Sequence, residues 1–235
     1  MKNHNLTEDK LFKLRIRHLK AVATLLQLTP FLRCIMLNGS LAEGKIRLSS
    51  DIDLLLVAKD RRIFTARFFA SILTWFTSLK RSSNTKKDHS GKFCLNYFLT
   101  ENFLVVPTGR GEKIDRYCAH NYSNSLMIWG KRDVYFNFIN ANRENWKKFL
   151  IRNKIPALPA GRQDTNIKQI QNRNKIKSSI PIRTFHMGVR FRDIVEKMIG
   201  DRIEQYLKKI QLRKIKIDDK YVVANDKELR FHSPN

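Results

Sequence analysis

The chain has 235 residues, which is enough for one large domain or two small ones. Hydrophobic residues make up 42% and include 15 phenylalanines, which excludes a wholly disordered chain, and the longest apolar run, Phe68 to Leu79, is too short and too rich in Ser and Thr for a membrane span. Lys and Arg number 46 against 21 acidic residues, and a net charge of +25 favours nucleic acid, free nucleotides or an anionic membrane surface as partner.

The basic residues are spread along the chain rather than gathered in one block, so a general compositional bias is the alternative to a specific partner. The cysteines Cys34, Cys94 and Cys118 are far apart and show no zinc-binding spacing. Cys34 and Cys94 lie in apolar runs, where we predict buried small hydrophobes. The cysteine usage and the lack of a signal-peptide pattern predict a cytoplasmic protein; the oligomeric state stays open.

The first half of the chain alternates helical and extended patterns. The first helical stripe includes Leu11, Leu14, Val22 and Leu26. The predicted elements are a helix over Thr7–Gln27, a strand over Phe31–Leu37, a helical turn over Leu41–Ile46, a strand over Leu54–Ala58, a helix over Arg62–Leu79, a loop over Arg81–Gly91, a strand over Lys92–Leu99 and a short element over Phe103–Val106. This mixture predicts an α+β fold.

The second half is predicted to be mostly helical. From Asp115 the pattern is helical with an interruption at Gly130, and two short helices are expected around Val134–Ile139 and Trp146–Leu150. The polar stretch Gln163–Ser179 predicts a linker or flexible insertion. We expect one long helix after Pro181, running through Gly200, and a last strand over Tyr221–Ala224.

The most informative segment joins the first two predicted strands. It runs from a strand through Asn38-Gly39-Ser40 and a short connection to Asp51-Ile52-Asp53 and the next strand. Gly39 lets the backbone approach a phosphate without an intervening side chain. Ser40 offers a hydroxyl where a helix can begin, and backbone N–H groups at such a start bind anions. The pattern therefore indicates a phosphate-binding turn.

Asp51 and Asp53 are two residues apart, so on an extended strand both side chains point to one face while Ile52 points into the core. Adjacent carboxylates repel each other unless a cation lies between them. Mg²⁺ suits such an oxygen-only pair, because it uses one or two carboxylates together with substrate phosphates, as in two-metal phosphoryl chemistry. The alternative is that these residues only cap a turn before the strand.

The residues Leu37-Asn38-Gly39-Ser40-Leu41-Ala42-Glu43-Gly44 and Ser49-Ser50-Asp51-Ile52-Asp53-Leu54-Leu55-Leu56 resemble the nucleotidyltransferase-domain superfamily, which includes DNA polymerase beta. They are most similar to the minimal nucleotidyltransferases of bacteria and archaea, over the first hundred or so residues. The resemblance implies a mixed sheet flanked by helices, a Gly-Ser turn that holds the triphosphate and an Asp pair that coordinates Mg²⁺ or Mn²⁺. A weaker resemblance, over Trp129–Tyr135, Asn140–Asn142, Trp146 and Leu229–His232, is to a helical extension of some bacterial members.

These readings divide the chain into four parts. The expected parts are a nucleotidyltransferase catalytic domain over 1–108, a helical extension over 109–155, a linker or insertion over 156–182 and a long helix with a short strand over 183–235.

Active members of the superfamily carry a third acid on a neighbouring strand. Its expected position here is Asn96, and asparagine cannot act as a general base. Glu101 and Asp88 are nearby alternatives. Lys45 and Arg47 follow the Gly-Ser turn and are candidate phosphate ligands, although solvated surface charges are commoner.

The expected function is metal-dependent transfer of a nucleoside monophosphate from a nucleoside triphosphate to an acceptor hydroxyl. Asp51 and Asp53 are the expected catalytic metal ligands, and Gly39, Ser40, Lys45 and Arg47 the nucleotide-binding residues. The positive charge favours RNA or another nucleic acid as acceptor. The alternatives are a nucleotide- or RNA-binding module with weakened catalysis, prompted by Asn96, and a toxin–antitoxin component.

Overall fold

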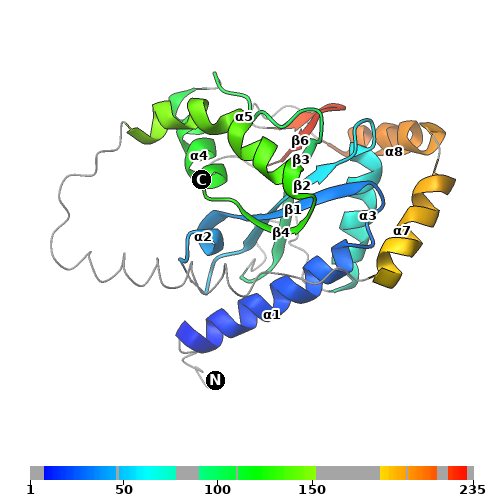
Figure 1. Cartoon of the computed structure of the whole chain (residues 1–235), viewed down its shortest axis with the longest axis horizontal. Coiled ribbons are helices and arrows are strands. Elements are labelled where there is room, and N and C mark those ends of the chain that lie inside the picture. Colours follow the sequence, from blue (N-terminus) through cyan, green and yellow to red (C-terminus); the bar gives the residue numbers. More distant parts are fainter. Residues whose placement is uncertain are drawn as a thin grey trace.

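A computed structural model describes residues 8–45, 48–77, 90–109, 111–151, 186–199, 201–215 and 222–231. These residues form an α+β fold around one mixed, open sheet of six strands in the order β4-β1-β2-β3-β6-β5 (Figure 1). The α+β class expected from the sequence is therefore confirmed. Within this part of the chain, no helix combines the length and the apolar character that crossing a membrane requires.

The strands are β1 (Leu32–Asn38), β2 (Ile52–Ala58), β3 (Phe93–Thr100), β4 (Leu126–Gly130), β5 (Val223–Ala224) and β6 (Glu228–Arg230). Only the β2–β3 pair is parallel; the other neighbours in the described sheet run antiparallel. The three central strands are almost fully buried because helices cover both faces of the sheet, which explains their continuous apolar sequences.

One face of the sheet is covered by α1 (Glu8–Leu26), α3 (Ile63–Phe76) and α8 (Asp201–Lys214). Leu19, Val22 and Leu26 of α1 pack there with Phe64 of α3 and Leu207 of α8. Leu14, which the helical pattern assigned to the buried stripe, is 39% exposed instead. The prediction was wrong at this position because the buried face of α1 is rotated toward Arg15, which is buried.

The other face is covered by α4 (Glu112–Ser123) and α5 (Arg132–Ile151), drawn in green above the sheet in Figure 1. Phe138 and Trp146 of α5 pack edge to face, with ring centroids 5.6 Å apart, and both are buried. Asn142 of α5 bonds the backbone of the segment after β3: its side chain accepts from the Val106 amide at 2.6 Å and donates to the Leu104 carbonyl at 2.7 Å. The short element predicted over Phe103–Val106 is therefore not formed as a strand or helix. The segment is held by these side-chain hydrogen bonds and by an isolated bridge between Thr100 and Phe103.

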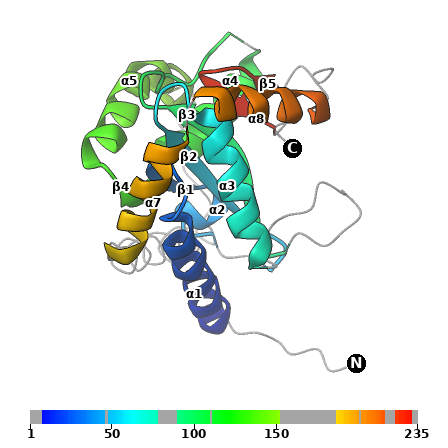
Figure 2. The same ribbon diagram turned by 90° about the vertical axis from the view of Figure 1, so that its right-hand side faces the viewer.

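The C-terminal segment completes the same sheet. β6 pairs with β3 through Tyr97, Phe98 and Leu99, and β5 pairs with β6 (Figure 1). The β6 side chains Glu228 and Arg230 form a buried ion pair at 3.7 Å. α8 crosses the first turns of α3 (Figure 2), and its Gln211 donates to the Phe64 carbonyl at 2.8 Å.

Other elements also differ from the sequence prediction. Leu126–Gly130 is a strand, β4, where helix was expected, and it pairs with β1 at the edge of the sheet. A single helix, α5, replaces the two predicted between Val134 and Leu150. In place of one long helix after Pro181 there are two, α7 (His186–Met198) and α8. The predicted linker over Gln163–Ser179 lies outside the described residues, and the four domain boundaries stay predictions.

Candidate metal centre

Three central strands bring the candidate site together. β1 ends at Asn38, which lies opposite Asp53 of the antiparallel strand β2, and Cys94 of the parallel strand β3 lies opposite Asp53 on its other side. The short helix α2 (Gly39–Ala42) begins directly after β1. The buried side chain of Asn38 accepts a hydrogen bond from the Ser125 hydroxyl, which anchors the strand end before the turn.

Gly39 is packed against a carboxylate. Its φ of +68° lies in the left-handed region, and a Cβ at this position would stand 2.5 Å from Oδ2 of Asp53. Any other residue would therefore suffer both backbone strain and a collision with a side chain of the site. The glycine expected to admit a phosphate thus also makes room for Asp53.

Asp51, Asp53 and Cys94 form a cluster in which one ligand atom of each residue lies within 4.8 Å of the others. Asp51 and Asp53 are half-buried, whereas the Cys94 side chain is buried with 7% exposure. Ile52 lies between the two acids in the chain but points into the core on the other face. Two carboxylates at this separation fit a divalent cation, because their mutual repulsion is relieved when a cation lies between them.

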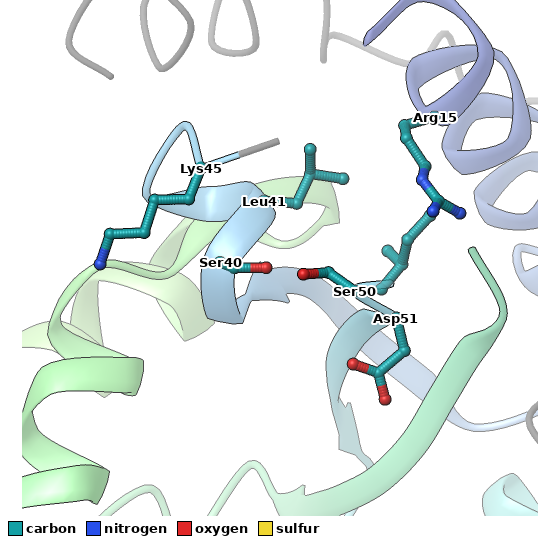
Figure 3. Close-up of a pocket in the computed structure, with 7 residues that line it drawn as sticks. Arg15, Ser40, Leu41, Lys45, Ser50 and Asp51 are labelled. Carbon is teal, nitrogen blue, oxygen red and sulfur yellow. The ribbon is translucent and has the colours of Figure 1, made fainter. Parts of the chain in front are cut away.

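A small pocket adjoins the cluster and is lined by Arg15, Ser40, Leu41, Lys45, Ser50, Asp51 and Ile52 (Figure 3). The Ser40 and Ser50 hydroxyls point toward one another, and Arg15 reaches the pocket from α1. Arg15 is only 6% exposed and donates to the Leu48 carbonyl at 2.8 Å and to Ser90 Oγ at 3.4 Å. A buried cation and two hydroxyls beside a carboxylate pair can bind an anionic group that carries a metal ion.

Of the two predicted basic ligands, Lys45 lines the pocket but its amine points away from Ser40 (Figure 3). It forms an ion pair with Glu43, which also accepts a hydrogen bond from His120 Nδ1 at 2.9 Å. Lys45 therefore already has an acidic partner within its own turn. Arg47 lies outside the residues that the structure describes.

The pKa of Glu43 is lowered: burial acts to raise it, but the hydrogen bonds from His120 and Lys45 outweigh burial. A carboxylate with a lowered folded-state pKa stabilises the fold above its unfolded pKa, and this contribution is lost as pH falls through the folded value. We expect Glu43→Gln to lower the free energy of unfolding at neutral pH and to have a shrinking effect as pH falls below about 4. Urea unfolding at several pH values tests this, with the exposed Glu112→Gln as control; an effect of Glu43→Gln that grows toward acid would contradict it.

The third-acid position stays a prediction at Asn96, whose side chain lies outside what the structure describes. The register between β2 and β3 shifts after Cys94, so that Leu55 pairs with Tyr97, and the backbone of Asn96 lies in this irregular stretch. Glu101 is excluded as a replacement, because its amide bonds the Ala58 carbonyl at the far end of β2 and its carboxylate lies 3.8 Å from Arg33 Nε. Asp88 is outside the described ranges. Among side chains that the structure describes, the β3 residue beside the Asp pair is Cys94.

Tyr117 of α4 lies close enough to the cluster to sense its charge. Burial raises the pKa of Tyr117, and the negative charges of Asp53 and Asp51 raise it further. The phenol therefore stays protonated at neutral pH and remains a hydrogen-bond donor. Sequence reasoning missed Tyr117, Arg15 and Cys94 as neighbours of the site, because each approaches it from an element distant in the chain.

Neither a scan against protein-family models nor a search of curated proteins finds a match for the chain.

Proposed function

We propose that the chain is a metal-dependent nucleotidyltransferase, which transfers a nucleoside monophosphate from a nucleoside triphosphate to an acceptor hydroxyl. The observation that carries this proposal is the contact between the Gly39 turn and Asp53, with the Asp51 carboxylate alongside. A turn that requires glycine and a carboxylate pair that favours a cation occupy one place, at the end of β1 and the start of β2. This is the arrangement that a metal-bound triphosphate needs.

The fold proposed for this activity is the nucleotidyltransferase type. Support comes from the order of its parts: a buried strand that ends in a Gly-Ser turn, an antiparallel neighbour that begins with Asp-Ile-Asp, and a third strand parallel to the second. Helices on both faces of the sheet agree with the flanking layers that the resemblance implies.

Different residues of the site would bind different parts of the substrate. Ser40 and Ser50 would donate hydroxyl hydrogen bonds to phosphate oxygens, and Arg15 would offset phosphate charge from within the protein. Asp51 and Asp53 would hold Mg²⁺ or Mn²⁺, which supplies charge neutralisation at the reacting phosphate when bound. Most of the rate gain would come from positioning and from this neutralisation.

The reaction balances as a substitution at the α-phosphorus. The acceptor oxygen forms a bond to the α-phosphorus, the bond to the bridging oxygen of the β-phosphate breaks, and pyrophosphate leaves with that electron pair. The acceptor hydroxyl loses its proton to solvent. A nucleic-acid hydroxyl is the proposed acceptor, because a chain with a net charge of +25 concentrates polyanions at its surface.

A transfer assay tests the proposal. The full chain is incubated with labelled ATP, CTP, GTP and UTP, with Mg²⁺ or Mn²⁺, and with a pool of small RNAs. We expect label on RNA with the wild type and a loss of at least about 100-fold with Asp51→Asn plus Asp53→Asn, because charge stabilisation at the reacting phosphate is removed. Asp60→Asn is the matched control, since Asp60 follows the other end of β2.

A second function is favoured by one observation: the described β3 side chain that lies in the cluster with the Asp pair is the thiol of Cys94 and not an acid. In that case the chain would be a nucleotide- or RNA-binding module with little turnover. Metal-dependent nucleotide binding that the double variant loses, without transfer of label, would favour this function. Absence of both transfer and metal-dependent binding would contradict both proposals.

A further inference from the structure

We propose that Cys94 is a third metal ligand of the Asp51–Asp53 centre, so that Zn²⁺ binds there more tightly than Mg²⁺ and inhibits transfer. The inhibition rests on the proposed nucleotidyltransferase function, whereas the binding of Zn²⁺ through Cys94 stands on the geometry of the three side chains alone.

The geometry comes from the pairing of β3 with β2. Parallel pairing sets Cys94 opposite Asp53, and both side chains lie on the same face of the sheet as Asp51. The Sγ atom and one oxygen of each carboxylate lie within 4.8 Å of one another. Asp51 directly precedes β2, Asp53 lies on β2 and Cys94 lies on the adjacent β3, so one ligand atom of each can reach a single cation with small side-chain rotations.

The chemistry of the donors decides which cation gains from the thiol. Mg²⁺ is a hard cation that prefers oxygen, so the sulfur contributes little to its binding. Zn²⁺ is borderline-soft and binds two carboxylates and a thiolate readily. When Zn²⁺ binds, the Cys94 thiol releases its proton to solvent and the thiolate takes the coordination position.

The other two cysteines provide a contrast within the same chain. Cys34 of β1 is fully buried, and burial raises the pKa of its thiol to about 12. Cys118 of α4 is buried against Arg230, whose Nη1 lies 3.8 Å from its sulfur. Neither belongs to the cluster with the two carboxylates. Of the three thiols, Cys94 is therefore the one placed to bind a cation together with Asp51 and Asp53.

The experiment uses Co²⁺ as a spectroscopic probe for Zn²⁺ in the full chain. We expect Co²⁺ to give a thiolate-to-cobalt charge-transfer absorption in the near ultraviolet, and Zn²⁺ to abolish it by displacement. Cys94→Ser should remove the absorption and weaken Zn²⁺ binding by at least about 10-fold, since even loss of a residue behind a metal ligand weakens binding by about 10–100-fold. Mn²⁺ binding, followed by the free-ion signal in electron paramagnetic resonance, should be unchanged in Cys94→Ser.

Two controls make the result decisive. Cys118→Ala should keep the absorption, and Asp53→Asn should weaken it although all thiols are present. If Cys94→Ser keeps the absorption or binds Zn²⁺ as tightly as the wild type, the proposal is overturned. A Cys94→Ala variant repeats the test with a different side chain.

The inhibition is tested separately in the transfer assay. Zn²⁺ added to reactions with excess Mg²⁺ should inhibit the wild type and Cys118→Ala, and inhibit Cys94→Ser at least about 10-fold more weakly, in line with the loss of affinity. Equal inhibition of wild type and Cys94→Ser would contradict the regulatory part. If no transfer occurs at all, the nucleotidyltransferase function fails, while the cobalt spectra still decide whether Cys94 is a ligand.

Discussion

Replacement of Gly39 by alanine is expected to abolish nucleotidyl transfer while the protein remains folded. The added Cβ would lie 2.5 Å from Oδ2 of Asp53, so either the turn or the carboxylate must move. A displacement of about 1 Å at a reacting group costs about 100-fold in rate. We therefore expect a loss of at least about 100-fold in transfer, together with weaker Mn²⁺ binding. Steady-state rates and Mn²⁺ titration measure the two effects.

Gly109 offers a matched control for the effect of backbone strain alone. Its φ of +90° is also in the left-handed region, but a Cβ there meets no atom within 4 Å. Gly109→Ala should therefore lower stability by about 1 to 3 kcal/mol from backbone strain and leave metal binding unchanged. Equal losses of Mn²⁺ affinity in both variants would show that the contact between residue 39 and Asp53 is unimportant.

Replacement of the buried Glu204 by alanine is expected to cause a large loss of folding stability. Glu204 of α8 is 4% exposed, and its carboxylate accepts hydrogen bonds from the backbone amides of Phe64 at 3.0 Å and Thr65 at 2.9 Å. These amides belong to the first turn of α3, which has no intrahelical acceptors for them. When these amides lose their charged acceptor, the free energy of unfolding should fall by about 3 kcal/mol.

The exposed acid at the start of the same helix is the control. Asp201 is paired with Arg62 at 2.6 Å, but its side chain is 88% exposed, so Asp201→Ala should cost less than about 1 kcal/mol. Chemical denaturation of both variants measures the difference. A cost for Glu204→Ala as small as that for Asp201→Ala would mean that water replaces the carboxylate at the α3 amides.

Elements with a strong local pattern were predictable from the sequence. The strands around the Gly-Ser turn and the Asp pair are short apolar runs, and helices such as α3 carry apolar residues at helical spacing. In each case the apolar pattern matches the element that forms. β4 was missed because Leu126–Gly130 is a short apolar run, and such a run fits a buried strand and a helix equally well. Only its pairing with β1, far away in the chain, makes it a strand.

The candidate site was predictable to the extent that it is local. Asp51 and Asp53 share a face because they are two residues apart on one extended segment. The neighbourhood of Cys94 depends instead on the register between β2 and β3, and its apolar flanks gave no indication of the carboxylates. Arg15 lies at the site because of how α1 is rotated about its axis on the sheet. Helical periodicity in the sequence did not fix this rotation closely enough, because Leu14 was expected on the buried face and is exposed.

The position of β6 has a consequence for the folding of the newly made chain. β6 follows its partner β3 by about 130 residues, and at about 5–20 residues per second synthesis takes roughly 6 to 26 s to supply it. Throughout that interval the edge of β3 formed by Tyr97, Phe98 and Leu99 lacks its native neighbour β6. An unpaired apolar edge invites intermolecular association. We therefore expect the yield of folded protein to depend on translation speed and on chaperones that shield this edge.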